Sequence, residues 1–186
     1  MTVNECIALA RACAGKGKYR MGGGANHPES PVPWGEDGTV DCSGFCCWAV
    51  GLAKYQPKLV WLKRITGGWF STNGIWWDAV MESTGHFSRI NKPRPGCIVV
   101  YPSSNLAKTA PDDFKSAVSD CPKVGHVGLV TVTPPGLLDV NGRESIRVIH
   151  ASSLNQKMAG YAIRETGIGM FEKRAAIWAW PSTLES

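Results

Sequence analysis

One cysteine, Cys42, stands where the sequence predicts the start of a buried helix. The segment 41–55, DCSGFCCWAVGLAKY, is apolar nearly all round after its first residues, and Asp41 is suited to cap a helix N-terminus. Aligned peptide dipoles and free N–H groups at such an end favour negative charge, so they should lower the pKa of the Cys42 thiol. The same N–H groups, including that of Cys42, could bind the oxyanion of a tetrahedral intermediate. This placement predicts a nucleophile, whereas an isolated cysteine would be read as a buried structural residue.

Two histidines stand on predicted strands later in the chain. His126 lies in GHVGLV, where Gly125 and Gly128 clear space around its ring, and His150 ends the run SIRVIHA. A thiol nucleophile needs a base that takes its proton and later gives it to the leaving amine, and imidazole does this near neutral pH. His150 could hydrogen-bond the other ring nitrogen of His126 and hold its tautomer. Taken singly, each histidine could instead be a core residue with satisfied hydrogen bonds.

Three segments together resemble the NlpC-type cell-wall peptidases, which belong to the papain-like cysteine hydrolases. DCSGF at 41–45 matches the nucleophile motif of that family letter for letter. GHVGLV at 125–130 matches its base motif, and VIHASS at 148–153 matches the segment of its third, orienting residue. The resemblance therefore implies Cys42 as nucleophile, His126 as base and His150 as the orienting group.

The resemblance extends from about residue 15 to residue 153, apart from the proline-rich loop at 26–35 and an insertion at 105–123. KYRMGGG at 18–24 is similar to the family's Tyr-x-x-Gly-Gly segment, whose tyrosine borders the active-site cleft, so Tyr19 is a substrate-binding candidate. Ser43 and Gly125, the motif neighbours of the predicted nucleophile and base, are further substrate-binding candidates. PRPGCIVVYP at 93–102 resembles the family's Pro-Gly-Asp-Leu strand, with Cys97 in place of the aspartate.

The family resemblance implies an α+β, papain-like NlpC-type fold, in which the nucleophile begins a buried helix packed on an antiparallel β-sheet. It also implies cleavage of an amide bond in peptidoglycan peptide stems, commonly between γ-D-glutamyl and a diamino acid. Some family members act as amidases or acyltransferases, so acyl transfer or a non-wall substrate is an alternative. A catalytically silent wall-binding module is another, although no motif residue is missing.

The pattern along the chain predicts helices first and strands afterwards, an α+β order. Apolar residues at helical spacing predict helices over 3–14 and 74–82, with Asn4 available to cap the first, and a short helix is expected at 112–118. Dense Gly and Pro predict an irregular loop over 15–40. Runs rich in β-branched residues predict strands at 97–101, 126–132, 145–151 and 175–180, and Asn141-Gly142 predicts a turn.

Composition sets the remaining expectations. A chain of 186 residues, 44% of them hydrophobic, suits one domain over 1–186. The net charge of +5 is spread along the sequence, which does not suggest a nucleic-acid partner. Neither a membrane span nor a secretory signal is expected, because the N-terminus has no basic region before its short apolar run. We therefore expect action in the periplasm or at the cell wall after delivery by a secretion system or phage, with an immunity protein or that delivery machinery as partner.

Cysteine and tryptophan positions complete the sequence predictions. The seven cysteines are an odd number, so at least one thiol stays unpaired, and their spacing with histidine does not fit the usual zinc sites, so no metal or cofactor is expected. Cys6, Cys13, Cys46, Cys97 and Cys121 are interpreted as small buried hydrophobic residues. Trp34 and Trp69 lie in glycine-rich sequence, where either could wall a cleft for sugar or peptide.

Overall fold

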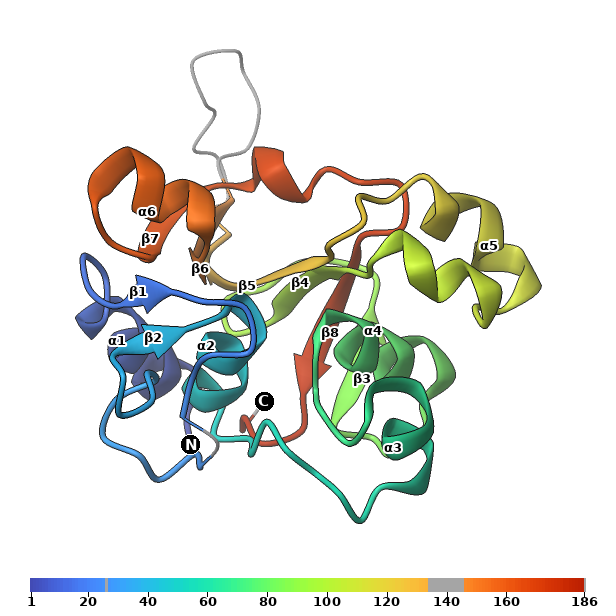
Figure 1. Cartoon of the computed structure of the whole chain (residues 1–186), viewed down its shortest axis with the longest axis horizontal. Coiled ribbons are helices and arrows are strands. Elements are labelled where there is room, and N and C mark those ends of the chain that lie inside the picture. The colour runs from blue at the N-terminus through green and yellow to red at the C-terminus, as the bar shows by residue number, and fades with distance from the viewer. Residues whose placement is uncertain (26, 134–145, 186) are drawn as a thin grey trace.

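A six-stranded sheet forms the centre of the molecule, and each neighbouring pair of its strands is antiparallel (Figure 1). The computed structural model describes residues 1–25, 27–133 and 146–185. In spatial order the strands are β3 (Phe87–Ile90), β8 (Ile177–Pro181), β4 (Ile98–Tyr101), β5 (His126–Val132), β6 (Arg147–Ala151) and β7 (Ile163–Gly167). Together with the six α-helices of the described residues, this sheet confirms the predicted α+β class.

Helix α2 (Cys42–Ala49) packs on the sheet strands β5 and β6. All of its residues are buried, as its apolar sequence predicts, and Asp41 is its N-cap, accepting a hydrogen bond from the backbone N–H of Gly44 at 2.6 Å. Helix α1 (Val3–Ala12) packs against α2. Its cap is Thr2, in a capping box with Glu5, and not Asn4 as expected, because Thr2 and Glu5 have the spacing that satisfies two end groups reciprocally.

A second group of helices covers the part of the sheet formed by β3, β8 and β4 (Figure 1). Helix α4 (Thr72–Met81), capped by Ser71, contacts all three strands, and α3 (Val60–Thr66) packs on α4. Helix α5 (Asp112–Ser119) and the 3-10 helix η1 (Ser104–Lys108) form the insertion between β4 and β5. In the part of the chain that is described, no helix is long and apolar enough to cross a membrane.

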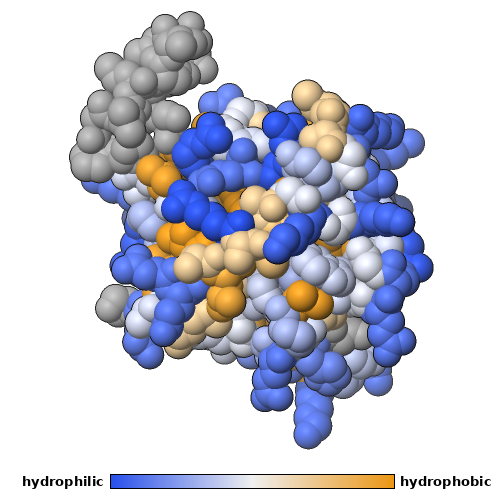
Figure 2. All heavy atoms as spheres, turned by 90° about the vertical axis from the view of Figure 1, so that its left-hand side faces the viewer, coloured by the Kyte–Doolittle hydropathy of each residue, from blue (hydrophilic) through white to orange (hydrophobic). Residues whose placement is uncertain are grey.

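The remaining elements lie near the other end of the sheet. Helix α6 (Ser153–Ala159) contacts β7 and β1 (Lys18–Tyr19), and the 3-10 helix η2 (Ile168–Phe171) follows β7. Strand β1 pairs in parallel with β2 (Thr39–Val40) inside the segment that we predicted to be entirely irregular. The face of the molecule on this side is mainly hydrophilic, with apolar side chains in small groups (Figure 2).

The predicted elements correspond closely to the observed ones. The four predicted strands are confirmed as β4, β5, β6 and β8, and the three predicted helices besides α2 as α1, α4 and α5. We did not predict α3, β3, α6 or β7, which are short and have mixed polar and apolar residues. The predicted Asn141-Gly142 turn lies outside the described residues. All seven cysteines lie within them and are buried free thiols, which confirms the interpretation of five of them as small core residues.

Candidate active site

The three motif residues meet where the first turn of α2 lies against the sheet. Cys42 is the first residue of α2, His126 the first residue of β5, and His150 lies on β6. Nε2 of His126 and Nδ1 of His150 are 2.9 Å apart. The backbone N–H of Val127, next to His126, hydrogen-bonds the Cys42 sulfur and so lowers the pKa of that thiol. The thiol and the two imidazoles therefore form one cluster, as the motif order predicts.

Sheet register explains how the two imidazoles meet. Val130 of β5 pairs with Val148 of β6, and Val148 also pairs with Thr166 of β7. Because side chains alternate along a strand, His126, His150 and Thr166 project from the same face of the sheet as these paired residues. His150 then has one diagonal neighbour on each side, at distances that side chains can bridge.

Thr166 determines which ring nitrogens carry protons. Its hydroxyl donates to the carbonyl of Gly167 at 3.1 Å, and its oxygen lies 3.1 Å from Nε2 of His150. A hydroxyl has one proton, so Thr166 must accept from His150, which places the His150 proton on Nε2. Nδ1 of His150 then accepts from Nε2–H of His126, and the lone pair of His126 is on Nδ1. His126 is thus oriented by two residues in series, His150 and Thr166, and the sequence analysis missed the second one.

Aromatic side chains enclose His126. The ring of Phe171 stacks on His126 with centroids 5.1 Å apart and meets His150 edge-on at 5.5 Å. The ring centroids of Tyr101 and His126 are 6.4 Å apart. A Cβ at Gly128 would lie 2.8 Å from Phe171 and 3.2 Å from Cβ of His150, so glycine is required for this packing. The sequence analysis expected Gly128 to clear space around the His126 ring, but the atoms nearest to such a Cβ belong to Val148, Phe171 and His150.

Burial controls the protonation of the cluster. It raises the pKa of Cys42 to about 12, with the nearby Asp41 charge adding to the effect, and lowers the pKa of His126 to about 4. The pKa of His150 falls to about 3 through burial and the positive charges of His126 and Arg164. The backbone N–H of Ser43 at the helix end does lower the pKa of the Cys42 thiol, as expected, but desolvation outweighs it, so the expected net lowering is wrong for the free protein. At rest the site holds a neutral thiol beside a neutral imidazole.

Two hydrogen-bond donors near the Cys42 thiol could serve a ligand: the backbone N–H of Cys42 and the phenol of Tyr19. In the first turn of α2, the N–H of Gly44 is bound by the Asp41 side chain and that of Phe45 by the Asp41 carbonyl. Among the described groups, no protein acceptor bonds the N–H of Cys42, so it can serve a ligand. Tyr19, brought opposite Val40 by the pairing of β1 with β2, lies beside Cys42. Burial and the negative charges of Cys42 and Asp41 raise the pKa of the Tyr19 phenol, which stays a neutral donor.

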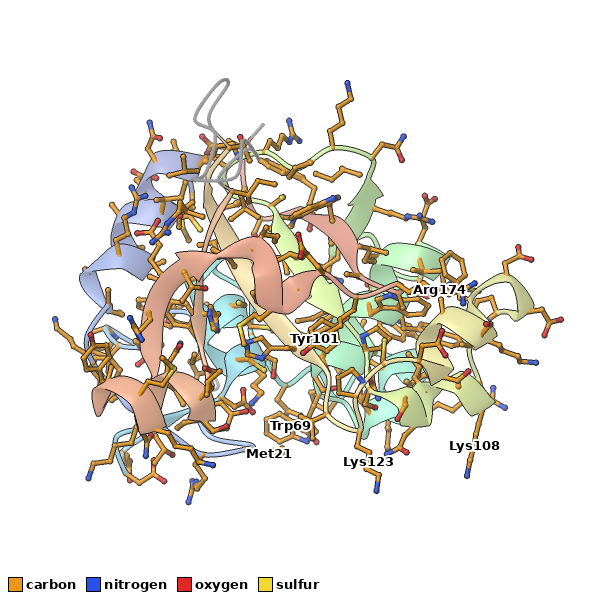
Figure 3. The ribbon with its side chains drawn as sticks, turned by 90° about the horizontal axis from the view of Figure 1, so that it is seen from above. Met21, Trp69, Tyr101, Lys108, Lys123 and Arg174 are labelled. Carbon is orange, nitrogen blue, oxygen red and sulfur yellow. The ribbon has the colours of Figure 1, made fainter. Side chains whose placement is uncertain are left out.

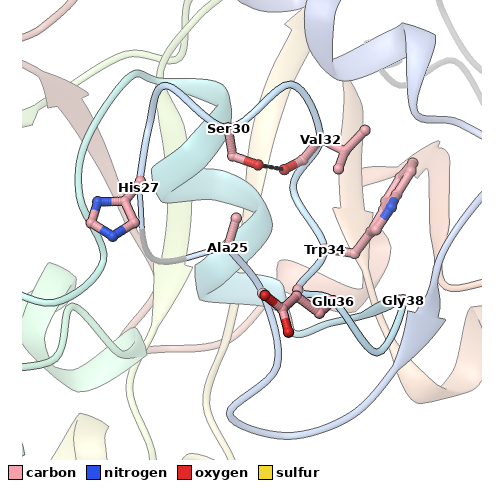
Figure 4. A pocket seen from close by; sticks show the side chains of 9 residues that line it. Ala25, His27, Ser30, Val32, Trp34, Glu36 and Gly38 are labelled. Atoms are coloured by element: carbon pink, nitrogen blue, oxygen red, sulfur yellow. Dashed lines mark hydrogen bonds between the residues drawn. The ribbon is translucent and has the colours of Figure 1, made fainter.

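A cavity of about 340 Å³ lies beside the start of α2 and is lined by Asp41 and Ser43, the chain neighbours of Cys42, but not by Cys42 itself. Trp69 and Met21 wall it, and Figure 3 shows these two side chains next to one another at the surface. A neighbouring hollow of about 390 Å³ shares Trp69 and Gly22 with it. Trp69 thus lies at a cleft, as proposed from the sequence. Trp34 lines a cavity of about 700 Å³ around Ser30 (Figure 4), which shares Gly24, Gly35 and Glu36 with the hollow of about 390 Å³ but no residue with the cavity beside α2.

The other predicted substrate residues have structural partners. The hydroxyl of Ser43 donates to Asp41 at 3.0 Å, and Ser43 also lines the cavity of about 340 Å³. A Cβ at Gly125 would lie 2.5 Å from Thr72 Oγ1 and 2.7 Å from the Tyr101 carbonyl, so this glycine is required for packing. Substrate contact by Ser43 or Gly125 stays a prediction.

Lys54 is a second residue that the sequence analysis missed. Its ammonium group lies 2.7 Å from Oδ2 of Asp41, and only 4% of its side chain is exposed. It has no motif neighbour, and a lysine after a helix is ordinarily a surface residue. Its burial beside Asp41 is a tertiary feature.

A scan against protein-family models finds no family that matches this chain, and a search of curated proteins finds no significant match. The chemistry of the site and the motif resemblance are therefore the basis on which a function can be proposed.

Proposed function

We propose that this protein is a papain-like cysteine hydrolase with an NlpC-type fold that cleaves an amide bond in the peptide stems of bacterial peptidoglycan. The observation that carries the proposal is the hydrogen bond from His126 to His150 beside the first residue of α2, Cys42. A thiol, an imidazole and a group that orients the imidazole are the components of cysteine hydrolase chemistry. The motif resemblance supplies the class of substrate.

The reaction begins with a proton transfer within the neutral pair. Nδ1 of His126 takes the proton of Cys42 as the sulfur attacks the amide carbonyl carbon, forming the C–S bond and an oxyanion. The N–H of Cys42 and the phenol of Tyr19 are the donors available to that oxyanion. His150 stabilises the imidazolium by accepting from Nε2–H of His126. Because neither charged form is favoured before substrate binds, the site relies on general-base activation of the thiol.

Collapse of the oxyanion breaks the C–N bond. The leaving amine receives the proton from His126 and departs, which leaves a thioester on Cys42. His126 then takes a proton from water, whose oxygen attacks the thioester carbon, and the acid product leaves as Cys42 regains its proton. Attack by another amine in place of water would give acyl transfer.

The test is digestion of purified peptidoglycan by the wild-type protein, Cys42→Ala and Cys13→Ala, with mass spectrometry of the released fragments. Cys13 is a buried free thiol at the end of α1 and serves as the matched control. We expect fragments from the wild-type and Cys13→Ala proteins and none from Cys42→Ala. Fragments that carry an added amine would instead assign acyl transfer. Equal fragments from the wild type and Cys42→Ala would refute the proposal.

We also propose that the protein acts in the periplasm or at the cell wall after delivery by a secretion system or phage. Periplasmic targeting of the wild-type protein should then inhibit bacterial growth, whereas Cys42→Ala targeted in the same way should not. The absence of any growth defect would contradict an antibacterial role and would leave the hydrolase assignment to the digestion experiment.

A further inference from the structure

We propose that Lys54 is a positioning residue of this site, which neutralises the Asp41 carboxylate beside Cys42 and ties the glycine loop 22–24 to the start of α2. The inference rests on the proposed role of Cys42 as the nucleophile. Lys54 belongs to none of the three motifs, and within the described structure it makes no hydrogen bond with His126 or with the Cys42 sulfur.

The contacts of Lys54 are those of a fixed group. Its ammonium donates to Oδ2 of Asp41 at 2.7 Å and to the carbonyl of Gly23 at 3.2 Å. The ring of Trp69 lies 5.8 Å from the ammonium, and the Lys54 carbonyl accepts from the N–H of Phe70 at 2.8 Å. A lysine is almost never this deeply buried without a partner, because an uncompensated ammonium loses its hydration. The pair with Asp41 makes that burial tolerable.

Asp41 has no capacity left for a ligand. Oδ1 accepts from the N–H of Gly44 at 2.6 Å and from the hydroxyl of Ser43 at 3.0 Å. Oδ2 accepts from the N–H of Gly22 at 2.8 Å and from Lys54. A carboxylate offers about four lone-pair positions, and each is occupied. Asp41 therefore works as a structural cap, and its charge is balanced within the protein.

Charge balance matters at this position because the chemistry creates anions there. The thiolate of Cys42 and the oxyanion that follows both form next to the carboxylate of Asp41, whose charge opposes them. Lys54 provides the compensating charge, consistent with its lowering of the Cys42 thiol pKa while Asp41 raises it. Without Lys54, the cap that holds the nucleophile would also disfavour its reactive form.

Lys54 also fixes the glycine loop 22–24 against the start of α2. Residues 22–24 approach the first turn of α2 so closely that a Cβ at Gly44 would lie 2.8 Å from the Gly23 carbonyl. Lys54 binds that same carbonyl, and the N–H of Asp41 also donates to it at 3.2 Å. Lys54 thus holds the loop between Tyr19 and the nucleophile in place, which aligns the phenol with the thiol.

The test measures the rate of Cys42 alkylation by iodoacetamide against pH for the wild type, Lys54→Met, Asp41→Asn and the variant with both changes. We expect Lys54→Met to react at least about tenfold more slowly than the wild type at neutral and at mildly alkaline pH, the effect of a rise of one unit or more in the thiol pKa. Asp41→Asn should react at or above the wild-type rate, since asparagine can still cap the helix and the opposing charge is gone. The double variant should recover most of the loss.

A role in stability alone predicts a different pattern, because loss of either partner of a buried pair would then lower reactivity and melting temperature together. Lys58→Met, a change of an exposed lysine nearby, is the matched control and should follow the wild-type profile. If Lys54→Met does not fold, the comparison of Asp41→Asn and the double variant with the wild type decides. Equal losses in Lys54→Met and Asp41→Asn, a slow double variant, or a folded Lys54→Met with the wild-type profile would each overturn the inference. Equal release of peptidoglycan fragments by the wild type and Cys42→Ala would instead overturn the proposed function.

Discussion

Replacing Thr166 by valine removes a single hydroxyl from the end of the hydrogen-bond series that leads to His126, the proposed base. In the wild type, the hydroxyl accepts from Nε2–H of His150 at 3.1 Å, and the lone pair of His126 is thereby placed on Nδ1. Valine has the same shape and cannot accept. His150 then either keeps an unpaired buried donor or moves its proton to Nδ1, which forces the proton of His126 onto the nitrogen that should act as base.

The size of the effect follows from the cost of that unpaired donor. Leaving a buried hydrogen-bonding group unsatisfied costs about 1 to 3 kcal/mol. At about 1.4 kcal/mol for each factor of ten, this free energy corresponds to a loss of about fivefold to about 150-fold in the active tautomer. Since Thr166 is only partly buried, water can replace some of the lost bond, so we expect the lower half of that range.

The assay is the alkylation rate of Cys42 near neutral pH, with peptidoglycan digestion as the second readout. Thr166→Ser keeps the hydroxyl and should retain most of the activity, while thermal melting of both variants reports on folding. A Thr166→Val protein that is folded and reacts at the wild-type rate would refute the derivation of the tautomer from the hydroxyl proton.

Two further outcomes follow from the packing of the site. Unfolded histidines protonate near pH 6.5, but burial holds the pKa of His126 at about 4 and that of His150 at about 3 in the folded protein. The free energy of unfolding should therefore fall as the pH drops from about 6.5 to about 4, by up to about 3 kcal/mol for each histidine. A melting temperature that does not change between neutral pH and about pH 5 would contradict this. Gly128→Ala should cost about 1 to 3 kcal/mol in urea unfolding and slow alkylation of Cys42, because its Cβ would lie 2.4 Å from Val148 Cγ1. Gly167→Ala is the control, because a Cβ at Gly167 would have no other atom within 4 Å. Equal stability of the Gly128→Ala and Gly167→Ala variants would be inconsistent with this packing.

Much of the fold could be predicted because its signals are local. The cap at Asp41 and the apolar run behind it specify α2, and alternating or continuous β-branched residues specify β4, β5 and β6. The elements that were missed, such as α3 and β7, have patterns too short and too mixed to be recognised. Their formation depends on the neighbours against which they pack.

Residue types and order within the sequence alone determined the nucleophile, the base and the orienting group as candidates, since cap, helix and strand signals all act over a few residues. Only the tertiary structure decided how these groups are protonated and held. Thr166 reaches His150 through the register of β6 with β7, and Lys54 reaches Asp41 from outside any motif. The pKa of Cys42 is raised and not lowered because desolvation sums over all the atoms that enclose the thiol, which a local sequence pattern does not specify.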